Sequence, residues 1–225
     1  MSSPSTPLRA SHSHSPLAHQ FEDLAQQREV ASLGMWVFLV TEILFFGGLF
    51  LVYSIYRSWY PGAFAAASHE LIVWAGTTNT VVLITSSLTM ALAVHAAETG
   101  NRRALILLLL ATMALGCVFL GIKAYEYRTE YLEHHIPAHG FEFEKTYFLQ
   151  AQIFFSLYFV MTGLHALHMI IGLGIMSVMV WMSWRGKITP EYSNPIEISG
   201  LYWHFVDIVW IFLFPLLYLI GRHVH

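Results

Sequence analysis

A polytopic membrane bundle of five transmembrane helices, all-α, is the fold class that the sequence predicts. Of the 225 residues, 56% are hydrophobic and only 11% are charged, whereas a soluble globular chain carries about 25% charged residues. The apolar residues are gathered into long runs, and about 20 apolar residues suffice for a helix to cross the hydrocarbon core of a bilayer. These observations exclude a soluble enzyme and indicate an integral membrane protein.

The net charge and the cysteine content exclude some kinds of partner and cofactor. The formal net charge of −3 provides no basic field for nucleic acid. Cys117 is the single cysteine, which excludes a disulfide within the chain and a thiolate metal cluster. Residues 1–28 are rich in Ser, Pro and polar residues, so we predict a disordered and interfacial tail there. Residues 29–225 are predicted to form the transmembrane domain.

The five apolar runs predict the helices in chain order. Trp59 and Tyr60 follow the first run, and Trp184 ends the fourth, as interfacial aromatic residues do. The fourth run is longer than one crossing needs and should therefore tilt or protrude. The predicted spans are residues 31–56, 71–97, 104–125, 151–184 and 198–220.

The connections between the runs predict the orientation. With five spans the termini face opposite sides, and two short loops on the N-terminal side carry Arg102, Arg103, Arg185 and Lys187. The positive-inside rule then favours a cytoplasmic N-terminus and an outer C-terminus. Residues 126–147 should form an acidic, solvated loop on the outer side, with docking or metal capture as the alternative. Lys123 should lie near a helix end, where its side chain can reach the interface.

Glu42 is the clearest ionisable residue inside a predicted span. A charge at the centre of a bilayer costs roughly 2.5 to 3.5 kcal/mol on insertion scales, so Glu42 should face protein rather than lipid. Without a cation nearby it should be protonated at neutral pH, because desolvation favours the neutral carboxyl group. A proton-handling role and a hydrogen bond between helices both account for this residue.

Two further groups of ionisable residues fall in the last two spans. His165 and His168 are three residues apart and share a helix face; they are candidate metal or haem ligands, or they form hydrogen bonds across helices. Glu197, His204 and Asp207 lie along one stripe of the fifth span. We expect His204 and Asp207 to reach each other or a shared partner, because a buried pair satisfies both groups.

Several stretches of the sequence resemble a known protein family. Residues 202–214, YWHFVDIVWIFLF, are very similar to the closing signature of subunit III of the haem–copper respiratory oxidases. Further stretches match that family in the same order, and the resemblance covers about residues 20–225. These stretches are residues 34–46 around Glu42, Asn79 and Thr80 followed by Ser86 and Ser87, residues 123–127, and residues 162–168.

The resemblance implies a role in a larger complex. The chain looks like the short five-helix bacterial form of this subunit, in the cell (inner) membrane with a cytoplasmic N-terminus and a periplasmic C-terminus. It would pack directly against subunit I, with subunit II nearby, bind phospholipid, and support proton uptake and lasting activity. Haem and copper would be held by the partner subunits, and this chain would carry no redox chemistry itself. By this resemblance, Glu42 matches the family's buried carboxylate, and His204 and Asp207 belong to its closing motif. Glu126, His165 and His168 also match positions of the family's motifs, without a separate role for each.

Several alternatives stay open. Cytochrome c is the favoured electron donor, but ubiquinol oxidases and, more loosely, nitric oxide reductases have such subunits. A membrane haem or metal protein with ligands His165, His168 and His204 is a rival of another class. An independent proton channel or carrier centred on Glu42 is a second rival.

Overall fold

The computed structural model describes residues 24–219, except for residues 138–140, 142, 144 and 145. This part of the chain is helical and contains no strand. Residues 1–23 of the predicted tail lie outside it. Residues 24–28 already belong to the first helix, which therefore begins earlier than the predicted residue 31.

Five helices are long and apolar enough to cross a membrane, as predicted. A short helix that the sequence did not suggest, α2 (Pro61–Glu70), connects the first two of them. A 3-10 turn, Pro190–Tyr192, precedes the last long helix, and a π-helical turn, η2 (Pro215–Leu219), continues it. The long helices are α1 (Leu24–Trp59), α3 (Val73–Glu98), α4 (Arg102–Leu132), α5 (Phe148–Trp184) and α6 (Asn194–Phe214).

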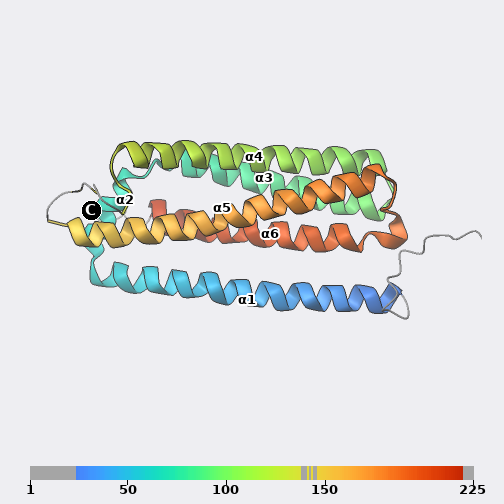
Figure 1. The fold of residues 1–225 in the computed structure, drawn as a ribbon, viewed down its shortest axis with the longest axis horizontal. Coiled ribbons are helices and arrows are strands. Elements are labelled where there is room, and N and C mark those ends of the chain that lie inside the picture. The colour runs from blue at the N-terminus through green and yellow to red at the C-terminus, as the bar shows by residue number, and fades with distance from the viewer. Residues whose placement is uncertain (1–23, 138–140, 142, 144–145, 220–225) are drawn as a thin grey trace, which may run out of the picture.

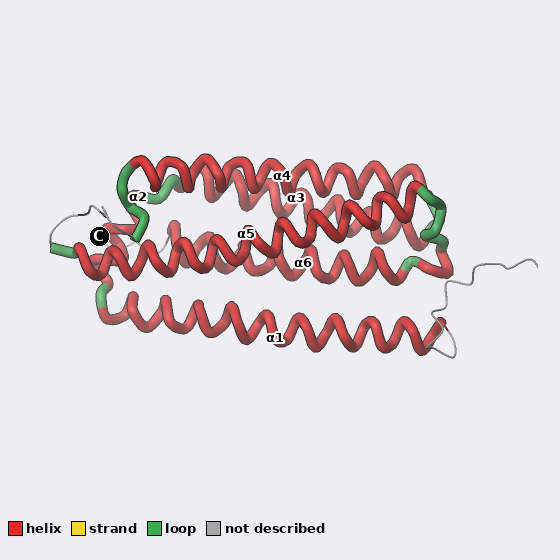
Figure 2. Tube along the Cα trace, in the orientation of Figure 1, coloured by secondary structure: helices red, strands yellow, loops and turns green. Residues whose placement is uncertain are grey.

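The long helices run roughly alongside one another, and their connections lie at the two ends of the bundle (Figures 1 and 2). Helices α3, α4, α5 and α6 pack together, whereas α1 lies along one side against α6 and α5. Only 11% of the most apolar window of α1 is buried, compared with 56% for α6. Helix α6 is therefore central, and α1 is peripheral.

Two tight connections depend on glycine. Gly100 between α3 and α4 has φ 73°, and Gly186 after α5 has φ 70°, values that residues with a side chain rarely adopt. The Asn101 side chain then accepts a hydrogen bond from the backbone N–H of Ala104, 3.2 Å away, and caps the first turn of α4. The short turn at Gly100 makes α3 and α4 antiparallel neighbours.

The core of the bundle is built around Trp203 of α6. A Cβ atom added at Gly116 of α4 or at Gly172 of α5 would lie 2.9 Å from the Trp203 ring. Only glycine therefore lets the two helices approach the indole this closely. The ring nitrogen of Trp203 donates to Ser86 Oγ of α3, 3.1 Å away, so one side chain connects α3, α4, α5 and α6.

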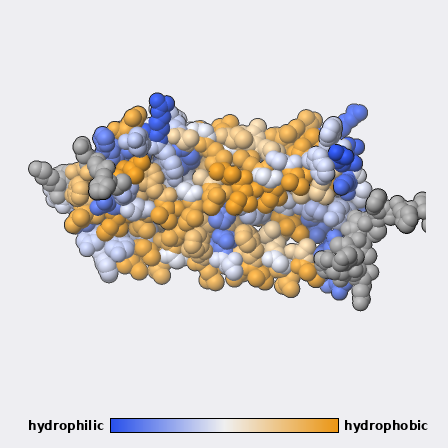
Figure 3. Space-filling model, viewed as in Figure 1, coloured by the Kyte–Doolittle hydropathy of each residue, from blue (hydrophilic) through white to orange (hydrophobic). Residues whose placement is uncertain are grey.

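The surface agrees with a membrane protein. Apolar side chains cover most of the length of the bundle, and hydrophilic ones gather toward its two ends (Figure 3). Helix α5 has 37 residues, which at 1.5 Å per residue is longer than one hydrocarbon layer requires. Its length confirms the expectation that the fourth span is too long for a single perpendicular crossing.

Candidate functional site

Glu42 faces protein, and its partner is His168. Oε2 of Glu42 on α1 lies 3.2 Å from Nε2 of His168 on α5, and the two side chains are 19% and 13% exposed. The other ring nitrogen of His168, Nδ1, lies 2.8 Å from the carbonyl oxygen of Leu164. Because a carbonyl can only accept, Nδ1 carries a proton and donates it to Leu164, while the Glu42 carboxyl group faces the other ring nitrogen at ion-pair distance without a hydrogen bond of ordinary geometry. The fold thus brings a carboxyl group and an imidazole, two side chains able to exchange protons, next to each other within the bundle.

The surroundings of His168 hold the ring in place. The Phe46 ring of α1 meets the imidazole edge-on at a centroid distance of 5.5 Å. The hydroxyl of Tyr202 on α6 donates to the backbone carbonyl of His168, 3.0 Å away. Helices α1, α5 and α6 thus meet at this pair, which joins the peripheral helix to the bundle.

A second buried pair lies in the C-terminal half of α4. Nζ of Lys123 donates to Glu126 Oε2 at 3.0 Å, to Tyr158 Oη at 3.1 Å and to Tyr218 Oη at 3.1 Å. The hydroxyl of Tyr218 in turn donates to the second carboxylate oxygen of Glu126. All three ammonium protons have acceptors, and both carboxylate oxygens are engaged, so the charges are compensated within the protein.

This arrangement corrects two predictions. Lys123 was expected to reach the interface from a helix end, and Glu126 to begin a solvated loop. Both are wrong, because α4 continues to Leu132 and the two side chains are 3% and 0% exposed. Glu130, also expected in that loop, is fully buried as well. Charges placed three and four residues apart turn to one face of the helix, and here that face is directed at α5 and η2.

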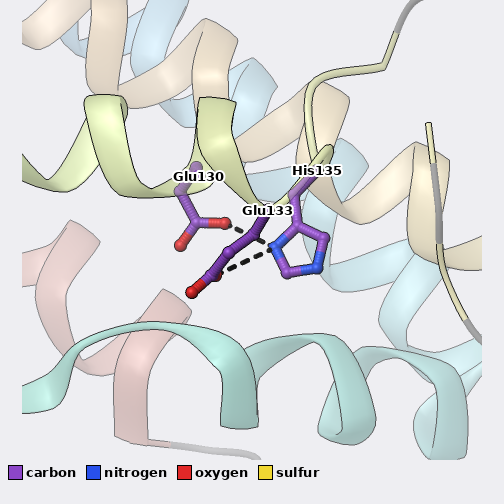
Figure 4. A group of neighbouring side chains, drawn as sticks. All are labelled: Glu130, Glu133 and His135. Carbon is purple, nitrogen blue, oxygen red and sulfur yellow. Dashed lines mark hydrogen bonds and ion pairs between the residues drawn. The ribbon is translucent and has the colours of Figure 1, made fainter. Parts of the chain in front are cut away.

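The end of α4 carries a third group, made of Glu130, Glu133 and His135 (Figure 4). His134 has φ 57°, and the chain turns back there so that Nδ1 of His135 lies 2.8 Å from Glu130 Oε2 and 3.7 Å from Glu133 Oε2. The hydrogen bond to Glu130 raises the pKa of His135 despite its partial burial, and the charges of Glu133 and Glu70 act in the same direction.

The ligand atoms of these three residues lie within 4.8 Å of one another, so the group could hold a metal ion. A protonated imidazole between two carboxylates satisfies the same atoms without a metal. The ring of His135 also stacks on Phe155 at a centroid distance of 4.8 Å, which suits a structural contact. We therefore describe this group as an ion pair.

The three histidines of the haem or metal alternative do not converge. His165 is buried between the rings of Phe119 and Trp210, with centroid distances of 5.3 Å to each. His168 is paired with Glu42. His204 Nδ1 lies 2.7 Å from Ser87 Oγ on α3. Among the described residues, these histidines do not form a shared ligand group.

The closing motif differs in its contacts from the expected pairing. His204 Nδ1 meets Ser87 and not Asp207, so the direct His204–Asp207 pair is absent, whereas Ser87 lies beside both residues as a shared neighbour. Asp207 is buried near Ser87, but its carboxyl oxygens make no hydrogen bond of ordinary geometry with the described residues. Glu197 accepts a hydrogen bond from Ser193 Oγ at the start of α6 and lies apart from both. The three residues therefore do not form one cluster: His204 and Asp207 lie near Ser87, and Glu197 bonds to Ser193.

Comparison with known proteins places this arrangement in a family. Residues 22–222 match the family model described as cytochrome c oxidase subunit III. The chain belongs to the cytochrome c oxidase subunit III family. The expected resemblance is thereby confirmed, and the chain is a subunit of a multi-subunit oxidase complex and a multi-pass membrane protein.

Relatives in this family carry two kinds of name. Cytochrome c oxidase subunit 3 of Thermostichus vulcanus is 34% identical over 191 residues, which is 84% of this chain and 87% of the relative. Cytochrome c oxidase subunit 3 of Corynebacterium diphtheriae is 35% identical over 88% of this chain and 96% of its own length. Quinol oxidase subunit 3 of Bacillus subtilis is 32% identical over 93% and 94%.

Several residues that build these clusters escaped the sequence-based prediction. Tyr158 and Tyr218 come from α5 and η2 and carry no local signal of pairing with Lys123. Glu130 could have been found, because Lys123, Glu126 and Glu130 recur every three to four residues, which is the spacing of one helix face. That spacing indicates a helix continuing through the charged residues rather than a loop.

Proposed function

We propose that the chain is the non-catalytic subunit III of a proton-pumping haem–copper terminal oxidase. It supports proton uptake, lipid binding and the durability of the catalytic subunit. The observation that carries this proposal is the juxtaposition of Glu42 and His168, a carboxyl group and an imidazole whose Oε2 and Nε2 atoms lie 3.2 Å apart inside the helix bundle. A group of this kind can take up or pass on a proton without any redox centre in the same chain.

The redox groups belong to the partner subunits in this proposal. Support comes from the three histidines of the alternative ligand set, which face different neighbours and do not converge among the described residues: His165 lies between Phe119 and Trp210, His168 faces Glu42, and His204 meets Ser87. Subunit I is the proposed direct partner, with subunit II in the same complex. The exposed apolar surface of α1 and the other helices is suited to such a partner and to phospholipid.

Cytochrome c is the proposed electron donor, and the membrane is the inner membrane of a bacterial cell. Relatives named quinol oxidase subunit 3 make a quinol the alternative donor. Oxidation of reduced cytochrome c and of quinol by the purified complex, measured side by side, tests this assignment. Faster turnover with quinol would reverse it.

Association with a haem–copper subunit is the first test. The chain, tagged and extracted in a mild detergent, should co-purify with a haem-containing subunit in a constant ratio. An independent proton channel would be isolated without haem. A chain that carries a Soret band after all other subunits have been removed would instead be a haem protein itself.

Glu42→Gln is the second test. The amide can replace a protonated carboxyl as a hydrogen-bonding group, so we expect the variant to assemble normally. Proton uptake during turnover should slow, or the complex should inactivate sooner. Glu29→Gln, the same substitution at an exposed position of α1, serves as the control. If both variants match the wild type in proton uptake and in lifetime, Glu42 is only a structural hydrogen bond.

A further inference from the structure

A groove between α3 and α6 combines apolar walls with a polar centre. It has a volume of about 380 Å³. Three of its residues are polar: Ser87 from α3, and His204 and Asp207 from α6. The other residues that line it are Leu83, Ile84, Leu88, Ala91, Ile208 and Ile211.

The polar centre lacks one hydrogen-bond donor. Asp207 is only 3% exposed, and neither of its carboxyl oxygens has a hydrogen-bond partner of ordinary geometry among the described residues. Ser87 is nearby, but its hydroxyl has a single proton and also contacts His204 Nδ1 at 2.7 Å, so it can supply at most one hydrogen bond to Asp207. Two carboxyl oxygens can accept several hydrogen bonds, so most of the accepting capacity of Asp207 is unused. Buried polar groups in proteins are otherwise almost always paired.

The depth of the groove restricts what can supply that donor. Ser87 lies near the middle of α3 (Val73–Glu98), and Asp207 lies past the middle of α6 (Asn194–Phe214). At 1.5 Å per residue, Ser87 is roughly 15–20 Å from either end of its helix. Lipid headgroups are therefore out of reach, and acyl chains have no donor. A side chain of another membrane-spanning segment has both the depth and the chemistry.

The surface around the polar centre suits a helix. Exposed aliphatic side chains follow α3 at intervals of three or four residues, namely Val81, Ile84, Leu88 and Leu92. Ile208 and Ile211 form the matching edge of α6 and are also exposed. An apolar stripe with a hydrogen-bonding group at its centre is typical of packing between transmembrane helices.

We propose that the α3–α6 groove receives a transmembrane helix of another subunit of the oxidase, whose hydroxyl, amide or amine donor hydrogen-bonds to Asp207. The inference rests on the proposed function, because the complex supplies the partner helix. It adds the face by which the chain docks and the group that recognises the partner.

Removal of the acceptor tests the polar contact. Asp207→Leu should weaken retention of the chain in the complex by about three- to twentyfold, the range for one hydrogen bond between membrane helices. Asp207→Asn should largely restore retention, because its amide oxygen still accepts. The thermal stability of the full chain extracted alone should not fall in Asp207→Leu. A fall there, with unchanged retention, would mean that Asp207 bonds within its own chain.

Steric and cross-linking variants test the groove itself. Ile84→Trp should reduce retention, whereas Val118→Trp, a matched change at an exposed position of α4, should not. In a Cys117→Ser background, Leu88→Cys should form a cross-link to another subunit through a short thiol-reactive cross-linker. The control Leu107→Cys, exposed on α4, should not form that product.

Two outcomes separate the inference from the proposed function. If the wild-type chain co-purifies with a haem–copper subunit but Asp207→Leu and Ile84→Trp are retained like their controls, the docking face lies elsewhere and only this inference fails. If the wild-type chain never co-purifies with such a subunit, the proposed function fails with it.

Discussion

Lys123 has an acceptor for every proton of its ammonium group, although it lies in the interior of a membrane protein. Its charge is stabilised by Glu126, and the rings of Tyr158 and Trp210 lie with their centroids 4.8 Å and 5.5 Å from Nζ. Such a pair adds little net stability compared with apolar residues of the same volume, but removal of one partner leaves an uncompensated charge. Residues of this kind hold helices in one defined register.

Lys123→Met should destabilise the chain by about 3 to 5 kcal/mol, because Glu126 loses its counter-ion while staying buried. Thermal or denaturant unfolding of the chain in detergent measures the effect. Lys123→Met combined with Glu126→Gln should recover much of the loss, since no buried charge is left alone. The exposed Lys187→Met serves as a control and should change stability by less than about 0.5 kcal/mol. Equal stability of Lys123→Met and wild type would show that the ion pair is not formed.

His135 gives stability a pH dependence. Glu130, Glu133 and Glu70 surround it, and its pKa in the folded chain is raised, first by the hydrogen bond to Glu130. The stabilising contribution is therefore fully present below the unfolded value of about 6.5 and is lost as pH rises through the higher folded value. Melting temperatures across this interval should fall for the wild type and fall less for His135→Gln. His95→Gln, at an exposed pair with Glu98, should keep the slope of the wild type.

At the scale of elements, the helices are positioned by Trp203 and two glycines. Gly116 and Gly172 present bare backbone to the indole from α4 and α5, and Ser86 of α3 accepts its N–H. Trp210, two helical turns after Trp203 on α6, likewise donates its ring N–H to a hydroxyl of α3, Thr80 Oγ1, 3.1 Å away. Small residues at such crossings allow close van der Waals packing, which replaces the hydrophobic effect as the force between helices in lipid.

Gly172→Ala should therefore destabilise the bundle by about 1 to 3 kcal/mol through overpacking against Trp203. The intrinsic gain from alanine in a helix, up to about 1 kcal/mol, offsets only part of this. Gly174→Ala is a matched control two residues along α5, because a Cβ atom there meets nothing within 4 Å. A comparison of the unfolding transitions of the two variants checks the prediction. Equal transitions would show that Trp203 can shift to accommodate the added methyl group without a loss of stability.

At the scale of the whole molecule, the loops that connect the long helices lie at two opposite ends of the bundle. The C-terminal end of α4 and the beginning of α5 lie at the end of the bundle opposite the beginning of α1 (Figure 1). The turn with Arg102 and Arg103 and the turn with Arg185 and Lys187 lie at the end where α1 begins. Short loops with this charge bias favour the cytoplasmic side.

Cysteine accessibility tests this orientation. In a Cys117→Ser background, Glu133→Cys should react with a membrane-impermeant maleimide in intact spheroplasts, because it lies on the proposed outer side. Lys187→Cys should react only after permeabilisation. The reverse pattern of labelling would place the N-terminus outside.

The sequence by itself determined the number of membrane-spanning helices, their order and the family, because hydropathy and motif identity are local properties of the chain. It also identified Glu42 as a carboxyl group that faces protein. It did not determine the partners: Tyr218 lies 95 residues from Lys123 along the chain, and Glu42 meets His168 only because α1 packs against α5. The C-terminal end of α4 was predicted too early, at residue 125 instead of Leu132, for the same reason. Buried charged residues such as Lys123 and Glu126 can continue a membrane helix only where neighbouring side chains neutralise them. Rotation and register of each helix, set by packing around Trp203, decided which ionisable groups meet.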